Sequence, residues 1–207
     1  DVRALDYDHA NLFNPWVLCD QTEPLTDIFA LLPWEEMVVN FPEAFRNWRY
    51  WANTTRFYEP AWKWFISNKG MMAYITNLIE TNQQFKNNYG LVKHLETRMT
   101  DEKFRDRQIA YVEKPSTGRL SMNVSFYDKN GNLIRKSAGG YSETQKVYQE
   151  YAKPGHTENG NFIVGYWTPP FFPCSISSDS GTMCIREFDG METDLANERF
   201  RPHVVSV

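Results

Sequence analysis

With 207 residues, 42% of them hydrophobic and 23% charged, the chain has the composition of a globular protein and not of a disordered one. Its formal net charge of −4 is small, which argues against a dedicated nucleic-acid-binding protein. The sequence contains no run of about 18 apolar residues, so we expect no transmembrane segment.

We expect a single domain over residues 1–207, because one hydrophobic core fits this length. Residues 1–24 show no sustained hydrophobic period and predict an irregular N-terminal arm. Helical patterns fill residues 26–100, strand patterns fill residues 109–188, and residues 189–207 form a mostly polar tail. This segregation predicts an α+β fold, with an N-terminal helical half packed on a C-terminal antiparallel sheet built from hairpins.

The N-terminal arm contains Asp6, Asp8 and His9, whose side chains are of metal-binding types. Their spacing matches no standard metal site, so we expect solvated polar groups, no metal site and no cofactor. Residues 1–40 carry eight acidic residues and one basic residue, whereas residues 41–70 carry five basic and two acidic residues. These two segments either pack side by side and neutralise each other, or the acidic one forms a separate docking face.

The helical half is divided by proline and glycine. Thr26 can cap a first helix that begins at Asp27 and ends at Pro33. Pro42 and Pro60 predict the starts of later helices, because proline is favoured in the first turn of a helix. The expected helices cover residues 27–32, 34–39, 42–52, 60–69, 71–85 and 91–99.

Residues 41–75 hold four of the seven tryptophans, and each large ring buries on the order of 150–250 Å² when covered. The segment is open to three interpretations: a plain core, a core whose edge continues into a subunit contact, or a pocket that stacks sugars, lipid or bases. The candidate interface or ligand-binding residues are Trp48, Trp51, Trp62, Trp64, Arg46 and Arg49.

Residues 120–127 alternate between apolar and polar and predict a half-buried strand. Residues 128–132 form a turn signal, and two registers compete for the strand that follows. A two-residue turn places Phe126 opposite Arg135, and a three-residue turn with Gly131 in the left-handed conformation places it opposite Ile134. Matching of apolar faces favours Ile134.

The rest of the C-terminal half is predicted from shorter patterns. We expect a helix over residues 142–151, a strand over residues 162–167 and a second hairpin over residues 174–188. The tail either runs along the surface or adds an edge strand.

Cysteines and glycosylation sequons leave the compartment open. Cys174 and Cys184 flank a polar turn, and a disulfide between them would stabilise the fold by roughly 3 kcal/mol, with Cys19 left over. Asn53 and Asn123 begin Asn-X-Ser/Thr sequons and predict a glycoprotein on a secretory route. Buried unpaired cysteines and chance sequons are also common, so extracellular, virion-exposed and intracellular locations all remain open.

Catalytic signatures are scarce. Asp179-Ser180-Gly181-Thr182 resembles the catalytic loop of aspartic proteases, which need two such carboxylates, and the sequence contains one copy. We therefore expect a polar hairpin turn there. No HExxH, CxxC, GxSxG or phosphate-cradling glycine pattern was found, and the catalytic residues are unknown.

These observations favour a non-enzymatic structural or interaction protein, a subunit of a larger or homo-oligomeric assembly, whose partner is another protein or a second copy. One alternative is a secreted module that binds a carbohydrate or an apolar ligand through exposed tryptophan and tyrosine. Another is a hydrolase with dispersed catalytic residues, including an acid such as Asp6 or Glu35. On balance we expect that the protein is not an enzyme.

Overall fold

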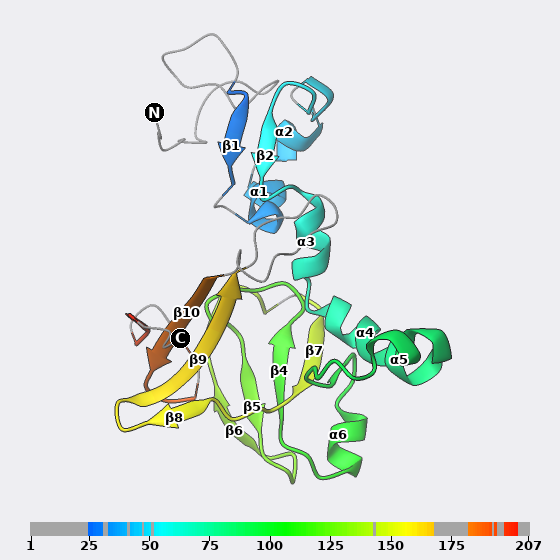
Figure 1. Ribbon diagram of the computed structural model, residues 1–207, viewed down its shortest axis with the longest axis vertical. Helices are drawn as coiled ribbons and strands as arrows, with labels where there is room; N and C mark the ends of the chain where they lie inside the picture. The colour runs from blue at the N-terminus through cyan, green and yellow to red at the C-terminus, as the bar shows by residue number, and fades with distance from the viewer. Residues whose placement is uncertain are drawn as a thin grey trace, which may run out of the picture. The chain divides into compact units, whose positions relative to one another are not determined.

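The computed structural model describes residues 25–30, 33–40, 42–46, 48–50, 52–142, 144–167, 182–191, 193 and 197–202 (Figure 1). Helices and several antiparallel sheets make up these residues, so the α+β prediction is confirmed. None of the helices described reaches the length and hydropathy needed for a membrane span. The backbone groups into two compact units, Asp1–Met71 and Met72–Val207, and each is described below by itself. The domain boundaries drawn from the sequence stay predictions.

The first unit contains a two-stranded parallel sheet and short helices. Its elements are β1 (Asp27–Phe29), α1 (Trp34–Asn40), α2 (Pro42–Arg46), the 3₁₀ helix η1 (Trp48–Tyr50), β2 (Arg56–Tyr58) and α3 (Trp62–Ser67). The helix predicted at Asp27 is wrong. Its backbone pairs with β2 instead, flanked by hydrogen bonds from Arg56 N to Thr26 O and from Ala30 N to Tyr58 O. Pairing with a strand about 30 residues away overrides the local capping signal.

The core of the first unit is organised around Trp34, which begins α1. Its ring meets Phe57 and Phe45 edge to face, at centroid distances of 5.0 and 5.9 Å. Its indole Nε1–H donates a 2.8 Å hydrogen bond to the carbonyl of Glu59. Met37, one helical turn later, is 1% exposed in the same cluster. The Trp34 indole thus buries its apolar surface, and its one hydrogen-bond donor has a partner.

The described residues of the second unit form two antiparallel sheets and three helices. The helices are α4 (Gly70–Thr81), which begins two residues before the unit, α5 (Gln83–Tyr89) and α6 (Glu102–Asp106). The five-stranded sheet has the order β3 (Thr97–Arg98), β7 (Lys146–Glu150), β4 (Tyr111–Pro115), β5 (Ser125–Tyr127) and β6 (Leu133–Lys136). The four-stranded sheet has the order β11 (Arg199–Arg201), β10 (Thr182–Phe188), β9 (Gly160–Trp167) and β8 (Gly155–Thr157).

The hairpin of β5 and β6 has the predicted turn but not the favoured register. Gly131 is left-handed, with φ +80°, and the Asp128 carboxylate accepts hydrogen bonds from two backbone N–H groups of the turn. Phe126 nevertheless pairs with Arg135, and the pairing shifts between Phe126 and Tyr127, so that Ile134 has no partner in the ladder. A β-bulge therefore accommodates Ile134 as the extra residue of β6, so that the pairing of Phe126 with Ile134 expected from their apolar character does not form.

Three further predictions differ from the structure. The helix predicted over residues 142–151 is wrong, because residues 146–150 form strand β7 between β3 and β4. Residues 91–99 contain strand β3 instead of a helix, and the strand predicted from residue 120 begins only at Ser125. The tail does add an edge strand, since β11 pairs with β10.

The two faces of the five-stranded sheet differ in chemistry. On one face, named here the tyrosine face, Tyr111 stacks between Phe104 of α6 and Tyr127, at 5.6 and 4.8 Å. Phe104 and Tyr111 are 0% and 2% exposed, so this face is a sealed aromatic core. Burial, together with the hydrogen bond from the Tyr111 hydroxyl to Asp101, raises the pKa of Tyr111 far above its ordinary value. The opposite face carries a lysine.

Candidate functional site

Lys114 lies on the face of the five-stranded sheet opposite to the tyrosine face, because side chains alternate along β4. Cross-strand pairing places Val112 beside Phe126 on one neighbouring strand and beside Gln149 on the other, all on the same face as Lys114. We name Val112, Lys114, Phe126 and Gln149 the lysine face. Lys114 is half-buried, so its ammonium group is held at a wall of the sheet and does not extend freely into solvent.

A row of hydrogen bonds fixes this ammonium group. Lys114 Nζ donates to Gln149 Oε1 at 2.7 Å, and Gln149 Nε2 donates to Thr97 Oγ1 at 2.9 Å. The backbone N–H of Thr97 donates to Thr76 Oγ1 of α4 at 3.1 Å. Thr97 and Thr76 are 1% and 4% exposed. Since each donor has a defined acceptor, the orientation of the Gln149 amide, and with it the lysine position, is set from inside the core.

Apolar side chains lie beside the lysine on the same face. Val112, Val124 and Phe126 form a buried cluster against which Tyr151 and Met191 pack. The Phe126 and Tyr151 rings meet edge to face at 5.8 Å. Of these side chains only Tyr151 and Met191 are partly exposed. A cation near a partly exposed aromatic ring suits a ligand with an anionic end and a flat apolar end.

Two connections of the sheet lie together and are named here the paired loops: residues 116–124 between β4 and β5, and residues 137–145 between β6 and β7. Asn123 joins them, since its side-chain oxygen accepts from Tyr141 N at 2.7 Å and its own N–H donates to Ala138 O at 3.3 Å. The first loop begins two residues after Lys114, with the sequence Ser-Thr-Gly-Arg. The second loop ends at Gln145, whose carbonyl accepts from Ser116 N at 2.6 Å. Both loops therefore reach the end of β4 that carries Lys114.

The paired loops are strained and tightly packed. Leu120, Ser121 and Asn123 have φ values of 53°, 56° and 56°, a region that residues other than glycine rarely adopt. At Gly139 an added Cβ would lie 2.4 Å from Met122 Cβ, so only glycine fits this contact. Strain of this kind is maintained by the surrounding structure and is concentrated at functional sites. The paired loops are accordingly candidates for ligand binding.

A network of ion pairs holds α4 to the β3 strand. Arg98 donates to both Glu80 of α4 and Glu96, while Arg107 donates to the other oxygen of Glu96 at 2.6 Å. The hydrogen bond from Arg98 lowers the pKa of Glu80. For Glu96, burial opposes the charged form, but the hydrogen bonds from Arg107 and Arg98 outweigh it and lower its pKa. This network is structural, because every charge in it is matched by its neighbours.

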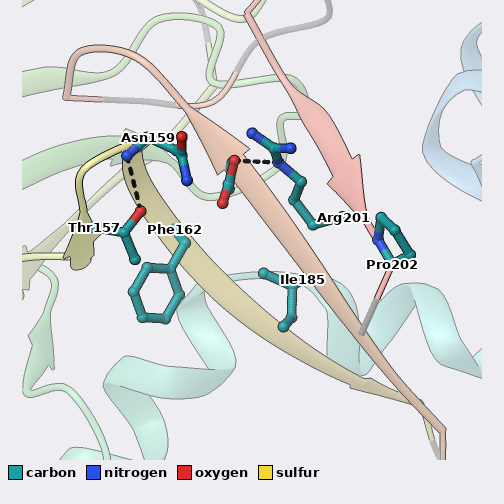
Figure 2. Close-up of a pocket in the computed structure, with 7 residues that line it drawn as sticks. Thr157, Asn159, Phe162, Ile185, Arg201 and Pro202 are labelled. Carbon is teal, nitrogen blue, oxygen red and sulfur yellow. Dashed lines mark hydrogen bonds and ion pairs between the residues drawn. The ribbon is translucent and has the colours of Figure 1, made fainter. Parts of the chain in front are cut away.

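A separate cavity of about 350 Å³ lies on the four-stranded sheet (Figure 2). It is lined by Thr157, Asn159, Phe162, Ile185, Glu187, Arg201 and Pro202. Cross-strand pairing of Phe162 with Glu187, and of Ile185 with Arg201, places all four side chains on one face of the sheet. Arg201 Nε donates to the Glu187 carboxylate, so the cavity contains an ion pair between apolar walls.

The candidate residues named from the sequence lie in the first unit. Among those that the structure describes, the side chains of Trp48, Trp62 and Trp64 are 58%, 61% and 38% exposed. Arg46 and Arg49 are also exposed, and Trp51 lies outside the described residues. None of the five that are described lines the cavity of Figure 2. A role in binding stays a prediction for all six.

The predicted disulfide and glycosylation sites stay predictions. Cys184 is half-buried in β10, but Cys174 and Cys19 lie outside the described residues, so the disulfide is untested. Asn53 is exposed in a turn. Asn123 is half-buried, its side chain accepts a hydrogen bond from Tyr141 N, and Ser125 of its sequon is 2% exposed. Glycosylation at Asn53 and at Asn123 stays a prediction.

Two features of this site were missed in the sequence. Lys114 lies in a strand that was not assigned, and Gln149 lies in the segment mistaken for a helix. One signal was present: a lysine followed closely by a Ser-Thr-Gly-Arg loop that joins two strands. Such a loop could have been considered for phosphate binding, since backbone N–H groups beside a lysine suit an anion.

Comparisons with known proteins identify the chain. The model of the family described as "Glutathionylspermidine synthase preATP-grasp" matches residues 11–206. "Trypanothione synthetase" of Crithidia fasciculata is 29% identical over 111 residues, which are 54% of this chain and 16% of that protein. "Putative acid--amine ligase" of Haemophilus influenzae is 28% identical over 127 residues, which are 59% of this chain and 30% of that protein. The aligned stretch spans less than a third of either relative.

These matches overturn the functional prediction. The family and both relatives bear the names of synthetases or ligases, so the hypothesis of a non-enzymatic structural protein is wrong, as is the expectation that the protein is not an enzyme. The interpretations as an oligomeric structural subunit, as a glycoprotein, as a secreted binding module and as a hydrolase fall with it. The wrong prediction rested on the aromatic content of residues 41–75 and did not take Lys114 or the loop that follows it into account.

Proposed function

Because the chain belongs to the glutathionylspermidine synthase preATP-grasp family, we propose that it forms part of a ligase that joins a carboxylic acid to an amine at the expense of ATP. The names of the family and of its relatives support an acid and an amine as the substrate classes. Since the chain aligns with less than a third of each relative, the complete reaction is assigned to a longer protein that contains these residues.

The chemistry explains why ATP is needed. A carboxylate does not react with an amine, because oxide is a poor leaving group. Transfer of a phosphoryl group to a carboxylate oxygen forms an acyl phosphate and releases ADP. The amine nitrogen then attacks the acyl carbon, the carbon–oxygen bond to phosphate breaks, and the amine proton passes to a base. The protein contributes mainly by holding the phosphates and neutralising their charge.

We assign the phosphates of ATP to Lys114 and the paired loops. The ammonium group supplies a point charge of the kind that binds phosphate, and one of its contacts, Gln149, is a neutral amide that positions it. Four backbone N–H groups of the first loop, those of Ser116, Met122, Asn123 and Val124, already donate within the protein, so the lysine carries the contact to the anion. Tyr151, which is half-buried against the cluster of Val112 and Phe126, supplies the apolar surface that a base requires.

The observation that carries this proposal is the fixed, half-buried Lys114 next to a strained loop. A lysine whose only task was solubility would have no need of a buried row of hydrogen bonds reaching back to α4. That row costs the burial of several polar groups, which a purely apolar sheet face would avoid.

The test is the affinity of the chain for a non-hydrolysable ATP analogue, AMP-PNP with Mg²⁺, measured by isothermal titration calorimetry. A charge-assisted contact contributes about 1.5–3 kcal/mol, so Lys114→Ala should weaken binding by about 10- to 100-fold. Lys153→Ala is the matched control, because Lys153 is an exposed loop residue, and it should bind as the wild type does. Equal affinities of the two variants would reject the assignment of Lys114.

We also propose that the exposed aromatic residues of α3 contact another part of the longer ligase. Trp62, Phe65 and Ile66 are 61%, 70% and 54% exposed, and a helix this apolar is normally covered. In a protein that contains the full ligase, Trp62→Ser should lower the thermal midpoint more than it does in the present chain. An equal shift in both would contradict the contact.

A further inference from the structure

The cavity of the four-stranded sheet contains a carboxylate that is not fully satisfied. Glu187 is 7% exposed, and its side chain is about nine-tenths buried. Its Oε2 accepts from Arg201 Nε, while no group in the described part of the chain donates to its Oε1. This oxygen is not fully enclosed by the protein, so solvent or a ligand in the cavity can reach it. A donor that replaces solvent there would form a charge-assisted hydrogen bond with the carboxylate.

Arg201 offers the complementary half of the site. Only its Nε is used, and neither terminal amino group donates to a side chain or carbonyl among the residues described. The arginine side chain is 44% exposed, so these donors are accessible from solvent. Figure 2 shows Arg201 and Pro202 at one side of the cavity, across from Phe162. One wall therefore presents an open acceptor and open donors next to each other.

The remaining walls are apolar or neutral. Phe162, Ile185 and Pro202 provide aromatic and aliphatic surface, and Thr157 and Asn159 close the turn end of the cavity. The Thr157 hydroxyl already accepts from the backbone N–H of Asn159 at 3.2 Å. A volume of about 350 Å³ falls in the range of small-molecule sites. The ligand thus needs a charged end and an apolar end.

The charges around the cavity select a zwitterion. Glu187 and Arg201 neutralise each other, and on the same face Arg199 is neutralised by Asp189 at 3.0 Å. A ligand with one charge would approach one partner of the pair and be repelled by the other. A ligand carrying adjacent opposite charges meets both partners favourably and leaves the site neutral.

We propose that this cavity binds an apolar α-amino acid, whose ammonium group donates to Glu187 Oε1, whose carboxylate accepts from the terminal amino groups of Arg201, and whose side chain packs against Phe162 and Ile185. The site uses neither Lys114 nor the paired loops, so it stands independently of the ligase proposal. It is an ancillary site on a different sheet, and its occupancy needs no ATP.

The test is binding of L-phenylalanine to the whole chain without nucleotide, measured by saturation-transfer NMR and by titration calorimetry. N-acetyl-L-phenylalanine lacks the ammonium group and L-phenylalaninamide lacks the carboxylate, so each should bind at least about 5-fold more weakly. Glycine lacks the side chain and should also bind more weakly. Absence of saturable binding of L-phenylalanine up to about 10 mM, or equal binding of the amide, overturns the proposal.

Variants locate the site. Glu187→Gln keeps the shape of the side chain but removes its charge, and should weaken L-phenylalanine binding by about 5-fold or more. Glu158→Gln makes the same substitution at an exposed turn residue outside the lining and should leave the affinity unchanged. Equal affinities of the two variants contradict the assignment. Should Glu187→Gln fail to fold, the blocked ligands decide the question with the unaltered protein.

Discussion

Replacing Arg98 by methionine should destabilise the second unit by an amount that depends on pH. Arg98 is the central cation of the network, with its side chain only 15% exposed, and it hydrogen bonds to Glu80 and to Glu96. Methionine keeps much of the stem and removes the charge. Glu96 is then left with Arg107, and Glu80 with Lys103 at 3.3 Å.

The size of the destabilisation by Arg98→Met can be estimated from the solvent exposure of the two glutamates. Glu96 is 20% exposed, so its contact with Arg98 lies between a buried ion pair, whose disruption costs about 3–5 kcal/mol, and a surface pair, which contributes less than about 1 kcal/mol. Glu80 is 41% exposed, so solvent screening limits its share to a few tenths of a kcal/mol. We expect Arg98→Met to lower the free energy of unfolding by about 2 kcal/mol at neutral pH.

The pH dependence gives the sharper test. The pKa of Glu80 and that of Glu96 lie below the ordinary value of 4.5 in the folded protein. A carboxyl with a depressed folded-state pKa stabilises the fold above 4.5, and this contribution is lost as the pH falls through the folded-state pKa. The difference between wild type and Arg98→Met should therefore be full at neutral pH and shrink progressively below pH 4.5.

Urea unfolding followed by circular dichroism at several pH values measures this difference. Lys129→Met is the matched control, because Lys129 is an exposed turn residue that forms no ion pair with any other residue described, and its effect should be close to zero at every pH. A loss in Arg98→Met that stays constant down to strongly acidic pH would show that the arginine acts through its packing alone, which refutes the electrostatic argument.

Three further outcomes follow from the second unit. Phe104→Ala removes a ring that is 0% exposed and should cost about 3–5 kcal/mol in urea unfolding, whereas a loss below about 1 kcal/mol would contradict a sealed aromatic core. Gly139→Ala brings a Cβ within 2.4 Å of Met122 Cβ, so it should weaken AMP-PNP binding in calorimetry, and an unchanged affinity would separate the paired loops from the nucleotide. The pKa of Tyr111 in the folded protein should lie well above the ordinary value of 10.0, so Tyr111 loses its proton at a lower pH in the unfolded state than in the folded state. The free energy of unfolding should therefore fall as the pH rises past 10. Ultraviolet titration of the folded protein should show one tyrosine that ionises only well above pH 10.

Local chemistry explains which parts of the fold were predictable. The turn over residues 128–132 was found because Asp128 and Gly131 act within five residues of each other. Helix α4 was found from its apolar period, although the predicted helix is divided at Asn82, whose side chain accepts from Phe85 N and starts α5. In both cases the deciding interactions are short in sequence.

Long-range pairing explains most of the errors. Strand β7 forms because β3 and β4 flank it from about 35 to 50 residues away, and its own five residues carry only a weak alternation. The hydrogen-bonded row of the site has the same origin, since Thr76, Thr97, Lys114 and Gln149 come from four separate elements. No pattern within one window of sequence indicates that these four side chains meet.

The position of Lys114 depends on the aromatic core behind it. Successive residues of β4 face opposite sides of the sheet, so Tyr111 and Glu113 share the tyrosine face, and Val112 and Lys114 share the lysine face. A slip of one residue would bury the ammonium group among tyrosine rings and expose Tyr111. The stack of Phe104, Tyr111 and Tyr127 disfavours that slip, because the slip would break the ring contacts that Tyr111 makes on both sides. The buried stack thus fixes the register of β4, and this register places Lys114 on the opposite face of the sheet, away from the aromatic rings.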